Sequence, residues 1–492
     1  MNEFTRRSFL KQISAAGLSS FVVREPSWLF AEEVDQRWKG LSKLDGSLLL
    51  DEGHREQMAT DFGANFHRVP LAVLKPRSTE DLVKIVRFAN AQGLKIAMRG
   101  QGHSQYGQTL VEGGIVVDSR TLNGVKLGAG VVDAQGGASW EEVTRQTLAQ
   151  GLTPPAMGDT MTLSVGGILS AGGISNSSHL FGAVVDTVEE VDVVTGAGDL
   201  LKCSAQRNRE LFELALAGMG QCGLIESARL RLVTAPKWVV RRDLMYDDLG
   251  KFLGDARRLA SEAKVEHLGA LVLADQTRGW TFKITIGKFC ESPEEADLRA
   301  VVADLRFKSS EDLMPVPFGL YLHREVARDT AAYAARKRTP SRALYITMFV
   351  PGSVGEEFVA RILATPAETS GVTRFSLYLL PVQKFTRPMF MLPRREEFAL
   401  ATFLIRAGGL PISDGERAYS EAVTTVRGLV DKTYAVGGKV YPPYAPFFSR
   451  ADWEAHYGPN WQRLIAAKNK FDPMGILTPG TGMFVAQQAA RL

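Results

Sequence analysis

The stretch RGQGHS at residues 99–104 places a histidine among small residues, directly after the apolar run LKIAM at 94–98. Its two glycines carry no Cβ atom, so they let the backbone approach a bulky partner closely. His103 could serve there as a metal ligand, a proton shuttle, a covalent anchor or an ordinary loop residue. The stretch alone leaves these four interpretations open, and other parts of the chain have to decide between them.

The bulk composition predicts a two-domain globular protein. The chain has 492 residues, which exceeds the usual size of one hydrophobic core, and it contains 45% hydrophobic and 23% charged residues. A net charge of +4 without a basic block argues against a nucleic-acid partner. The cysteines Cys203, Cys222 and Cys290 lack metal-type spacing and allow at most one disulfide, so we expect neither a metal site nor a disulfide framework.

The N-terminus is similar to a twin-arginine export signal. TRRSFLK at 5–11 is followed by the moderately apolar QISAAGLSSFVV at 12–23, which ends at Arg24 and is shorter than the ~20 residues of a membrane span. We therefore expect residues 1–31 to be a signal segment that directs the protein to the periplasm or outside the cell, without stable membrane insertion. The alternative is an amphipathic or disordered arm on a cytoplasmic protein.

The chain up to Pro236 interleaves short strands with helices. A strand, a helix and a strand are predicted over 69–104, with Ser78 capping the helix. A hairpin is predicted over 189–203 and a helix over 208–223. This mixture predicts a compact α+β unit.

Beyond Pro236 the strands alternate more strictly between apolar and polar residues. This pattern predicts a second domain built on a half-exposed antiparallel sheet. The residues expected on one face are Trp280, Phe282, Ile284 and Ile286 in one strand and Phe375, Leu377 and Leu379 in another.

Several catalytic templates are absent from the sequence. There is no HExxH and no GxSxG around the glycine-rich loops, and GQGHSQ lacks the third glycine of the dinucleotide fingerprint. Two glycine-rich loops remain, at 99–104 and 164–175. Exposed backbone N–H groups in such loops suit a pyrophosphate, because they bind anions without charged side chains. The alternative is two tight turns in a glycine-rich fold.

Three motifs in order resemble a known family of flavoproteins. RGQGHS is followed by Gln108, by GDTMTLSVGGILSAGGIS at 158–175 and by GMGQCGLI at 218–225. This series resembles the vanillyl-alcohol-oxidase-type (PCMH-type) FAD-linked oxidoreductases, and within them the cytokinin dehydrogenases. The resemblance extends over about 55–486, including the closing segment 449–480, and is faint through 240–440.

The resemblance implies an α+β, two-domain FAD-binding PCMH-type flavoprotein with an antiparallel-sheet cap that binds substrate. We expect the FAD domain over 55–237, the cap over 238–440, and a C-terminal segment, 441–492, that returns to the FAD domain. FAD would lie extended between the domains, since cofactor sites favour domain interfaces.

The resemblance also implies roles for individual residues. His103 would bind FAD covalently, as a single link because 154–167 contains no cysteine; the alternative is dissociable FAD beside a loop histidine. Asp159 would be the catalytic base and also contact the cofactor; the alternative is that it caps a local turn. The other cofactor contacts expected are Gly100, Gln101, Gly102, Ser104, Gln108, Ser164, Gly166, Gly167, Ser170, Ile174 and Ile225, with Tyr444 and Thr478 matching more loosely.

The implied reaction is hydride transfer from a substrate carbon to FAD, followed by reoxidation by an electron acceptor, oxygen or a quinone. The expected small-molecule substrate is a cytokinin-like N6-substituted adenine or another amine. Two alternatives are oxidation of alcohols, sugars or lactones, and a flavin-binding redox protein without turnover.

Two departures from the family weaken the cytokinin assignment. The faint alignment places Lys283 where plant cytokinin dehydrogenases have a glutamate that helps to hold the purine. Reversal of a charge in the substrate pocket would change what is bound there. Near the C-terminus, Thr481 replaces the glutamine of the family's SPGQ sequence.

Overall fold

The computed structural model describes residues 36–275, 279–327, 330–331, 341–406 and 410–484. The expected signal segment, residues 1–31, lies outside the described residues. The chain divides into two units, 1–43 and 44–492, and all the sheets belong to the second. No helix in the described part is both long and apolar enough to cross a membrane.

A four-stranded sheet with the order β1-β2-β4-β3 opens the second unit. Strands β2, β4 and β3 are parallel to one another. The predicted helix over this region is confirmed, and Ser78 Oγ accepts the N–H of Asp81 at its start at 3.2 Å. Strand β3 ends at Arg99, so it places RGQGHS at the end of the sheet. The elements are β1 (Ser47–Leu49), α3 (Glu52–Gln57), β2 (Ala72–Lys75), α4 (Thr79–Gln92), β3 (Ile96–Arg99) and β4 (Ile115–Asp118).

A five-stranded antiparallel sheet with the order β5-β6-β10-β8-β9 follows. Strands β8 and β9 confirm the hairpin predicted over 189–203. The elements of this region are β5 (Val125–Leu127), β6 (Val131–Gln135), α5 (Trp140–Leu148), β7 (Leu152–Thr153), α6 (Val165–Ala171), α7 (Ser178–Phe181), β8 (Val188–Val194), β9 (Leu200–Ser204), α8 (Arg209–Ala215), β10 (Leu224–Arg231) and β11 (Val233–Thr234).

The helix predicted over 208–223 is wrong in its length, because α8 ends at Ala215. The next residues do not continue the helical hydrogen bonds. The N–H of Ala217 donates to the carbonyl of Leu169 at 2.8 Å, and that of Met219 donates to the carbonyl of Ser170 at 2.9 Å. These tertiary bonds to α6 turn the segment 216–223 into a loop, and the apolar pattern of the sequence does not reveal them.

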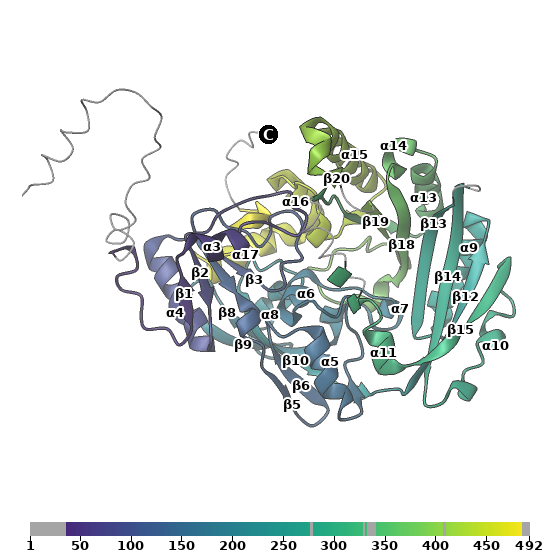
Figure 1. The fold of residues 1–492 in the computed structure, drawn as a ribbon, viewed down its shortest axis with the longest axis horizontal. Coiled ribbons are helices and arrows are strands. Elements are labelled where there is room, and N and C mark those ends of the chain that lie inside the picture. Colours follow the sequence, from purple (N-terminus) through teal and green to yellow (C-terminus); the bar gives the residue numbers. More distant parts are fainter. Residues whose placement is uncertain (1–35, 276–278, 328–329, 332–340, 407–409, 485–492) are drawn as a thin grey trace, which may run out of the picture. The chain divides into compact units, whose positions relative to one another are not determined.

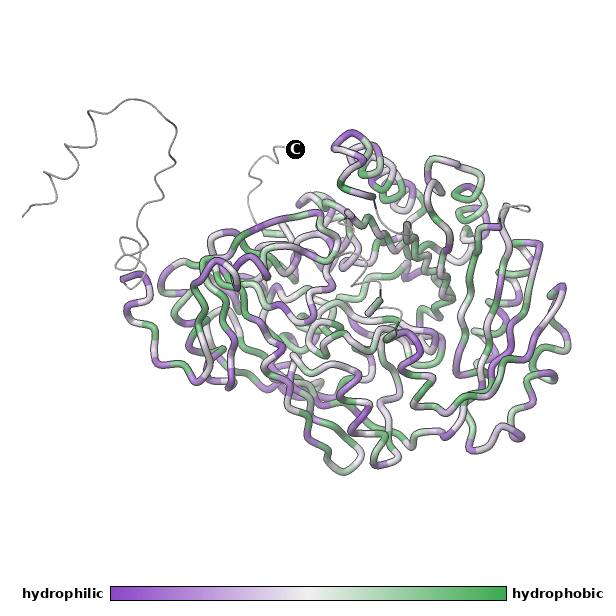
Figure 2. The backbone as a smooth tube through the Cα atoms, viewed as in Figure 1, coloured by the Kyte–Doolittle hydropathy of each residue, from purple (hydrophilic) through white to green (hydrophobic). Residues whose placement is uncertain are grey.

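An eight-stranded sheet with the order β15-β12-β14-β13-β18-β19-β17-β21 makes up the cap, and every neighbouring pair in it is antiparallel (Figure 1). The alternation predicted for its strands is confirmed by the buried side chains of Phe282, Ile284, Ile286, Phe375, Leu377 and Leu379. Figure 2 shows hydrophilic and hydrophobic residues mixed along these strands.

The cap elements all come from residues 238–440. They are β12 (Trp238–Tyr246), α9 (Leu249–Glu262), β13 (His267–Asp275), β14 (Gly279–Cys290), α10 (Leu298–Val302), β15 (Ser309–Pro317), α11 (Phe318–Leu322), β16 (Ser341–Arg342), β17 (Ile346–Pro351), α13 (Gly355–Leu363), α14 (Pro366–Thr369), β18 (Val372–Pro381), β19 (Phe398–Arg406), β20 (Leu410–Pro411), α15 (Gly415–Ala435) and β21 (Lys439–Val440).

The C-terminal segment leaves the cap and packs against the first sheets. Helices α16 (Arg450–Tyr457) and α17 (Asn460–Phe471) are followed by a chain that runs beside β3. The N–H of Ile96 donates to the carbonyl of Ile476 and the N–H of Thr478 donates to the carbonyl of Ile96, both at 2.8 Å. Thr478 is thereby held next to the start of RGQGHS.

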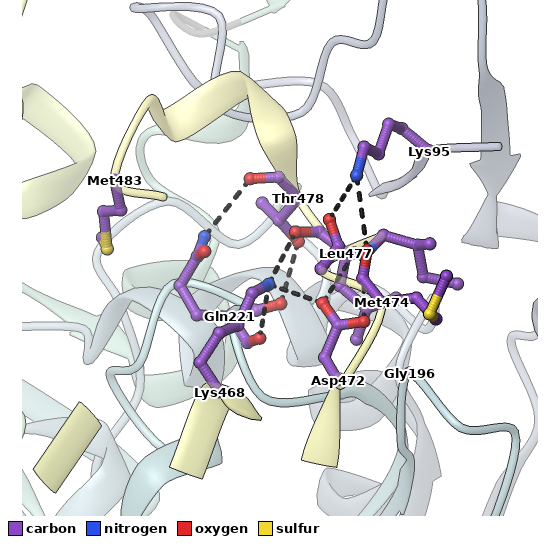
Figure 3. A network of polar contacts seen from close by, with 12 residues as sticks. Lys95, Gly196, Gln221, Lys468, Asp472, Met474, Leu477, Thr478 and Met483 are labelled. Carbon is purple, nitrogen blue, oxygen red and sulfur yellow. Dashed lines mark hydrogen bonds and ion pairs between the residues drawn. The ribbon is translucent and has the colours of Figure 1, made fainter. Parts of the chain in front are cut away.

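A buried ion pair holds this return in place (Figure 3). Lys468 Nζ lies 2.6 Å from Asp472 Oδ2, and the two side chains are only 6% and 0% exposed. Lys468 also donates to the carbonyls of Gln221 and Leu477, at 2.9 and 3.0 Å. The Asp472 carboxylate accepts the N–H groups of Ile476 and Leu477, each at 2.9 Å. The pair therefore ties α17 both to the 218–223 loop and to the final segment.

We expect Lys468→Met to lower the free energy of unfolding by about 3–5 kcal/mol, because the substitution leaves the buried Asp472 carboxylate without its counter-charge. Urea unfolding of the flavin-loaded protein measures the loss. The control is Lys470→Met, two residues along the same helix, where the ion pair with Glu210 is largely exposed and should contribute less than about 1 kcal/mol. Equal losses in the two variants would contradict the structural role of Lys468.

Candidate functional site

A long cavity lies where the first two sheets face the cap. Loops from the first part of the chain line most of it, and residues of β18, β19 and the segment after β21 close the remainder. The structure brings all fifteen residues predicted for the site to this one cavity: Gly100, Gln101, Gly102, His103, Ser104, Gln108, Asp159, Ser164, Gly166, Gly167, Ser170, Ile174, Ile225, Tyr444 and Thr478.

The two glycine-rich loops touch each other on one wall. A Cβ atom on Gly100 would lie 2.1 Å from the Oγ atom of Ser164 and 2.9 Å from its Cβ atom, so only glycine allows this approach. Gly102 has a φ of 71°, in the left-handed region that glycine occupies without strain. The His103 ring follows and stacks on Phe62, with 4.2 Å between ring centroids.

Close contacts also form a neighbouring part of the same wall. The N–H of Gly166 donates to the carbonyl of Gly136 at 2.8 Å, which draws α6 against the strand β6. A Cβ atom on Gly220 would lie 2.9 Å from the Oγ1 atom of Thr478, so the C-terminal return packs directly on the 218–223 loop. Backbone atoms and small side chains therefore form this part of the wall.

The glycine-rich part of the cavity suits a pyrophosphate. Among the described residues that line the cavity there is no lysine or arginine, whereas hydroxyl groups are frequent. Hydroxyls and backbone N–H groups bind phosphate oxygens through dipoles, without fixed positive charge. The serines and threonines on the wall are Ser104, Thr109, Ser119, Thr160, Ser164, Ser170 and Thr478.

The other part of the cavity is aromatic. The ring of Phe403 on β19 lies 5.6 Å from that of Tyr378 on β18 and 5.7 Å from that of Tyr444. Tyr441 is fixed behind them, because its hydroxyl accepts the N–H of Gly173 at 2.8 Å. A cavity with dipoles at one end and flat apolar surfaces at the other fits a dinucleotide that carries a planar ring system.

Asp159 lies at the aromatic end and has three polar partners. Its Oδ2 atom accepts hydrogen bonds from Asn176 Nδ2 at 3.0 Å and from the Tyr378 hydroxyl at 3.3 Å. Its Oδ1 atom lies 3.3 Å from Nη2 of Arg324. Burial raises the pKa of Asp159 above that of an ordinary aspartate, although Arg324, Asn176 and Tyr378 each oppose the increase.

A second cavity begins at Asp159. Gly158 and Asp159 line both cavities, so the carboxylate lies at the boundary between them. The second cavity has aromatic walls that include Phe181, Phe289 and Phe318. A group that reaches Asp159 can therefore extend away from the first cavity over apolar surface.

Several site residues were not predicted from the sequence. Tyr378, Phe403 and Arg324 belong to the cap, where the sequence contains no short motif that marks them. Asn176 directly follows the motif 158–175, so an extension of that motif by one residue would have included it.

The expectation that Lys283 faces the substrate is wrong. The residues that line the two cavities in the described part of the chain do not include Lys283. Its Nζ atom instead pairs with Asp243 on the neighbouring strand β12, at 2.8 Å. Thr481 also packs away from the cavity wall, where its hydroxyl accepts a hydrogen bond from Gln221 at 3.0 Å.

Comparison with known proteins places the chain in a family. Residues 70–204 match the family described as FAD binding domain, and 291–484 match "Cytokinin dehydrogenase 1, FAD and cytokinin binding". An oxidoreductase named for ORF5 of the fasciation locus of Rhodococcoides fascians is 32% identical over 89% of this chain and 99% of its own length. Cytokinin dehydrogenase 4 of Oryza sativa is 30% identical over 90% of this chain and 91% of its own. The chain belongs to the cytokinin dehydrogenase family.

The fold of this cytokinin dehydrogenase family member is shared more widely. The crystal structure of 6-hydroxy-D-nicotine oxidase from Arthrobacter nicotinovorans superposes with a TM-score of 0.66 at 19% identity, over 89% of this chain and 97% of the other. The expected two-domain PCMH-type fold is confirmed. The protein is an FAD-dependent oxidoreductase, so the alternative of a flavin-binding protein without turnover is set aside.

We expect Gly100→Ala to reduce the FAD content of the purified protein several-fold, because the added methyl group collides with Ser164 and separates the two glycine-rich loops. Flavin absorbance relative to protein absorbance measures the content. Gly428→Ala, on the surface helix α15 with no atom near the added methyl group, is the control and should keep its flavin. A Gly100→Ala protein with full flavin would show that the loops need not touch.

Proposed function

We propose that this enzyme oxidises a carbon next to a substrate N–H group, with an N6-substituted adenine or a related amine as substrate. The observation that carries the proposal is the position of Asp159, a buried carboxylate at the aromatic end of the cavity that fits FAD. The names of the relatives support the adenine class, since several are cytokinin dehydrogenases.

Bound FAD would supply the acceptor for one hydride, which carries both electrons, from the substrate carbon. Asp159 would accept the proton of the neighbouring N–H group, so that a carbon–nitrogen double bond forms as both hydrogens leave. Tyr378 and Asn176 both donate hydrogen bonds to Oδ2 of the Asp159 carboxylate. These bonds fix the direction in which the lone pairs of Oδ1 point. Oxygen or a quinone would then reoxidise the flavin.

The electrostatics of Asp159 suit a base. A carboxyl group acts as a base only when it is ionised. Burial raises the pKa of the Asp159 carboxyl group. A higher pKa also makes the carboxylate a stronger base once it is ionised. Catalysis should therefore rise with pH as Asp159 loses its proton, at a pH above the ordinary aspartate range.

The alternative substrates, alcohols, sugars or lactones, lose their main support. They were favoured by a positive charge from Lys283 in the substrate pocket, and that lysine pairs with Asp243 outside both cavities. The N–H substrate class therefore remains the better match to Asp159.

We also propose that His103 binds FAD covalently. The residue lines the cavity, and its ring is held against Phe62. A neutral imidazole is a competent nucleophile near neutral pH. A Cβ atom on Gly102, directly before His103, would lie 2.6 Å from Nη2 of Arg99, so only glycine fits at this position.

A panel of N6-substituted adenines, alkylamines, alcohols and sugars, assayed by dye reduction, tests the substrate class. With the best substrate, we expect Asp159→Asn to slow flavin reduction by about 10²- to 10⁴-fold, because the amide keeps the size of the side chain but cannot accept the proton. Flavin content should stay near wild type, and the rise of kcat/KM with pH should disappear. Loss of the flavin would favour a turn-capping role, and full activity would refute the role of Asp159.

We expect the wild-type protein to keep its flavin on the polypeptide after denaturation in acid, whereas His103→Ala should be yellow when native and should release its flavin under the same treatment. Gel filtration in denaturant, followed by absorbance, separates bound from free flavin. His179→Ala, whose imidazole is buried and bonds to the Val265 carbonyl outside the cavity, is the control and should keep the link. Release of flavin by the wild type would exclude a covalent bond.

A further inference from the structure

We propose that Arg324 is a positioning residue that holds Asp159 ionised and oriented, an inference that rests on Asp159 acting as the base. The arginine follows α11 in the cap, whereas Asp159 belongs to the FAD-binding part. Nη2 of Arg324 lies 3.3 Å from Oδ1 of Asp159. The pair thus joins the two parts of the enzyme at the boundary between the two cavities.

The guanidinium group of Arg324 is itself fixed. Its central carbon lies 4.2 Å from the centre of the Tyr321 ring, and Nη1 donates to the Tyr321 carbonyl at 2.9 Å. The Tyr321 hydroxyl is 2.6 Å from His267 Nδ1 on β13. Because the side chain is only 19% exposed, its charge stays beside Asp159 instead of turning into solvent.

Arg324 and the neutral partners of Asp159 act on different oxygens. Asn176 and Tyr378 both bond to Oδ2, whereas the contact of Arg324 is with Oδ1. Two fixed directions on two oxygens define the plane of the carboxylate. Loss of Arg324 would therefore change both the charge that Asp159 meets and the orientation of Oδ1.

The other titratable groups around this cluster come from α11 and the residues after it, and from the strands β12, β13, β14 and β18. Glu325 follows Arg324, with 3.8 Å between its carboxylate and the Arg324 Nε atom, and opposes the arginine by raising the pKa of Asp159. Burial raises the pKa of Tyr321 on α11 and of Tyr378 on β18, and lowers that of His267 on β13 well below its usual value. These three rings therefore stay neutral at working pH, and Arg241 and Lys283 add positive charge near His267.

A positive charge within 4–6 Å typically lowers an aspartate pKa by about 1–3 units. Removal of Arg324 should consequently move the ionisation of Asp159 upward by about one unit or more. Below that pH a larger fraction of the enzyme would carry a protonated, inactive Asp159. Well above it, the base would be ionised with or without the arginine.

The test compares Arg324→Gln and Arg324→Lys in the flavin-loaded enzyme. The pH midpoint of kcat/KM should rise by about one unit in Arg324→Gln, which lowers kcat/KM about tenfold on the acid side, and by less in Arg324→Lys, which keeps the charge. Arg342→Gln is a matched control, since Arg342 lies 4.1 Å over Tyr419, pairs with Glu416 and is 23% exposed, away from both cavities. Its midpoint should equal that of the wild type.

An infrared measurement without substrate makes the test independent of turnover. The band of a protonated carboxyl that Asp159→Asn removes should titrate about one unit higher in Arg324→Gln than in the wild type. If this band and the midpoint of kcat/KM stay in place, or if activity falls equally at every pH, the role of Arg324 is overturned. If the band moves but Asp159→Asn remains fully active, the proposed catalytic role of Asp159 fails and the positioning by Arg324 stands.

Discussion

The Lys468–Asp472 ion pair fixes the path of the chain on which the cavity depends. Two charges taken out of water repay their desolvation only when further hydrogen bonds satisfy them, and here two carbonyls and two N–H groups do so. Those four groups belong to the 218–223 loop and to the segment after α17. The pair thus sets where Ile476 and Thr478 lie beside β3, and Thr478 completes the cavity wall against Gly220.

The two ends of the cavity differ in the charged and polar groups that line them. No lysine or arginine lines the described part of the wall at the glycine-rich end. An anion would therefore be bound there by backbone dipoles and hydroxyl groups. Charge is concentrated instead at the aromatic end, on Asp159 and its partner Arg324. The groups that would bind the pyrophosphate are therefore separate from the charged pair of Asp159 and Arg324.

The sequence predicted the glycine-rich part of the cavity far better than the part that the cap contributes. Gly100, His103 and Ser164 lie in short motifs whose geometry is local, because a close backbone approach requires glycine wherever the fold makes it. Likewise, β3 and α4 follow from periodicity and from the cap at Ser78. Arg324 and Tyr378 reach Asp159 only through the packing of β18 and α11, which no local pattern encodes. The overlong helix predicted at 208–223 and the misplaced Lys283 failed for the same reason, since tertiary hydrogen bonds and an ion pair with Asp243 decide their positions.

An enzyme built in this way can change its substrate specificity through the cap alone. Asp159, the proposed base, belongs to the FAD-binding part, but its counter-charge Arg324 and its hydrogen-bond donor Tyr378 come from the cap. A substitution near Arg324 or Tyr378 can therefore alter the pKa and orientation of Asp159 while the glycine-rich loops, the 218–223 loop and the Lys468–Asp472 pair stay as they are. Because such a substitution leaves the glycine-rich part of the cavity in place, that part can be preserved while recognition changes beside it.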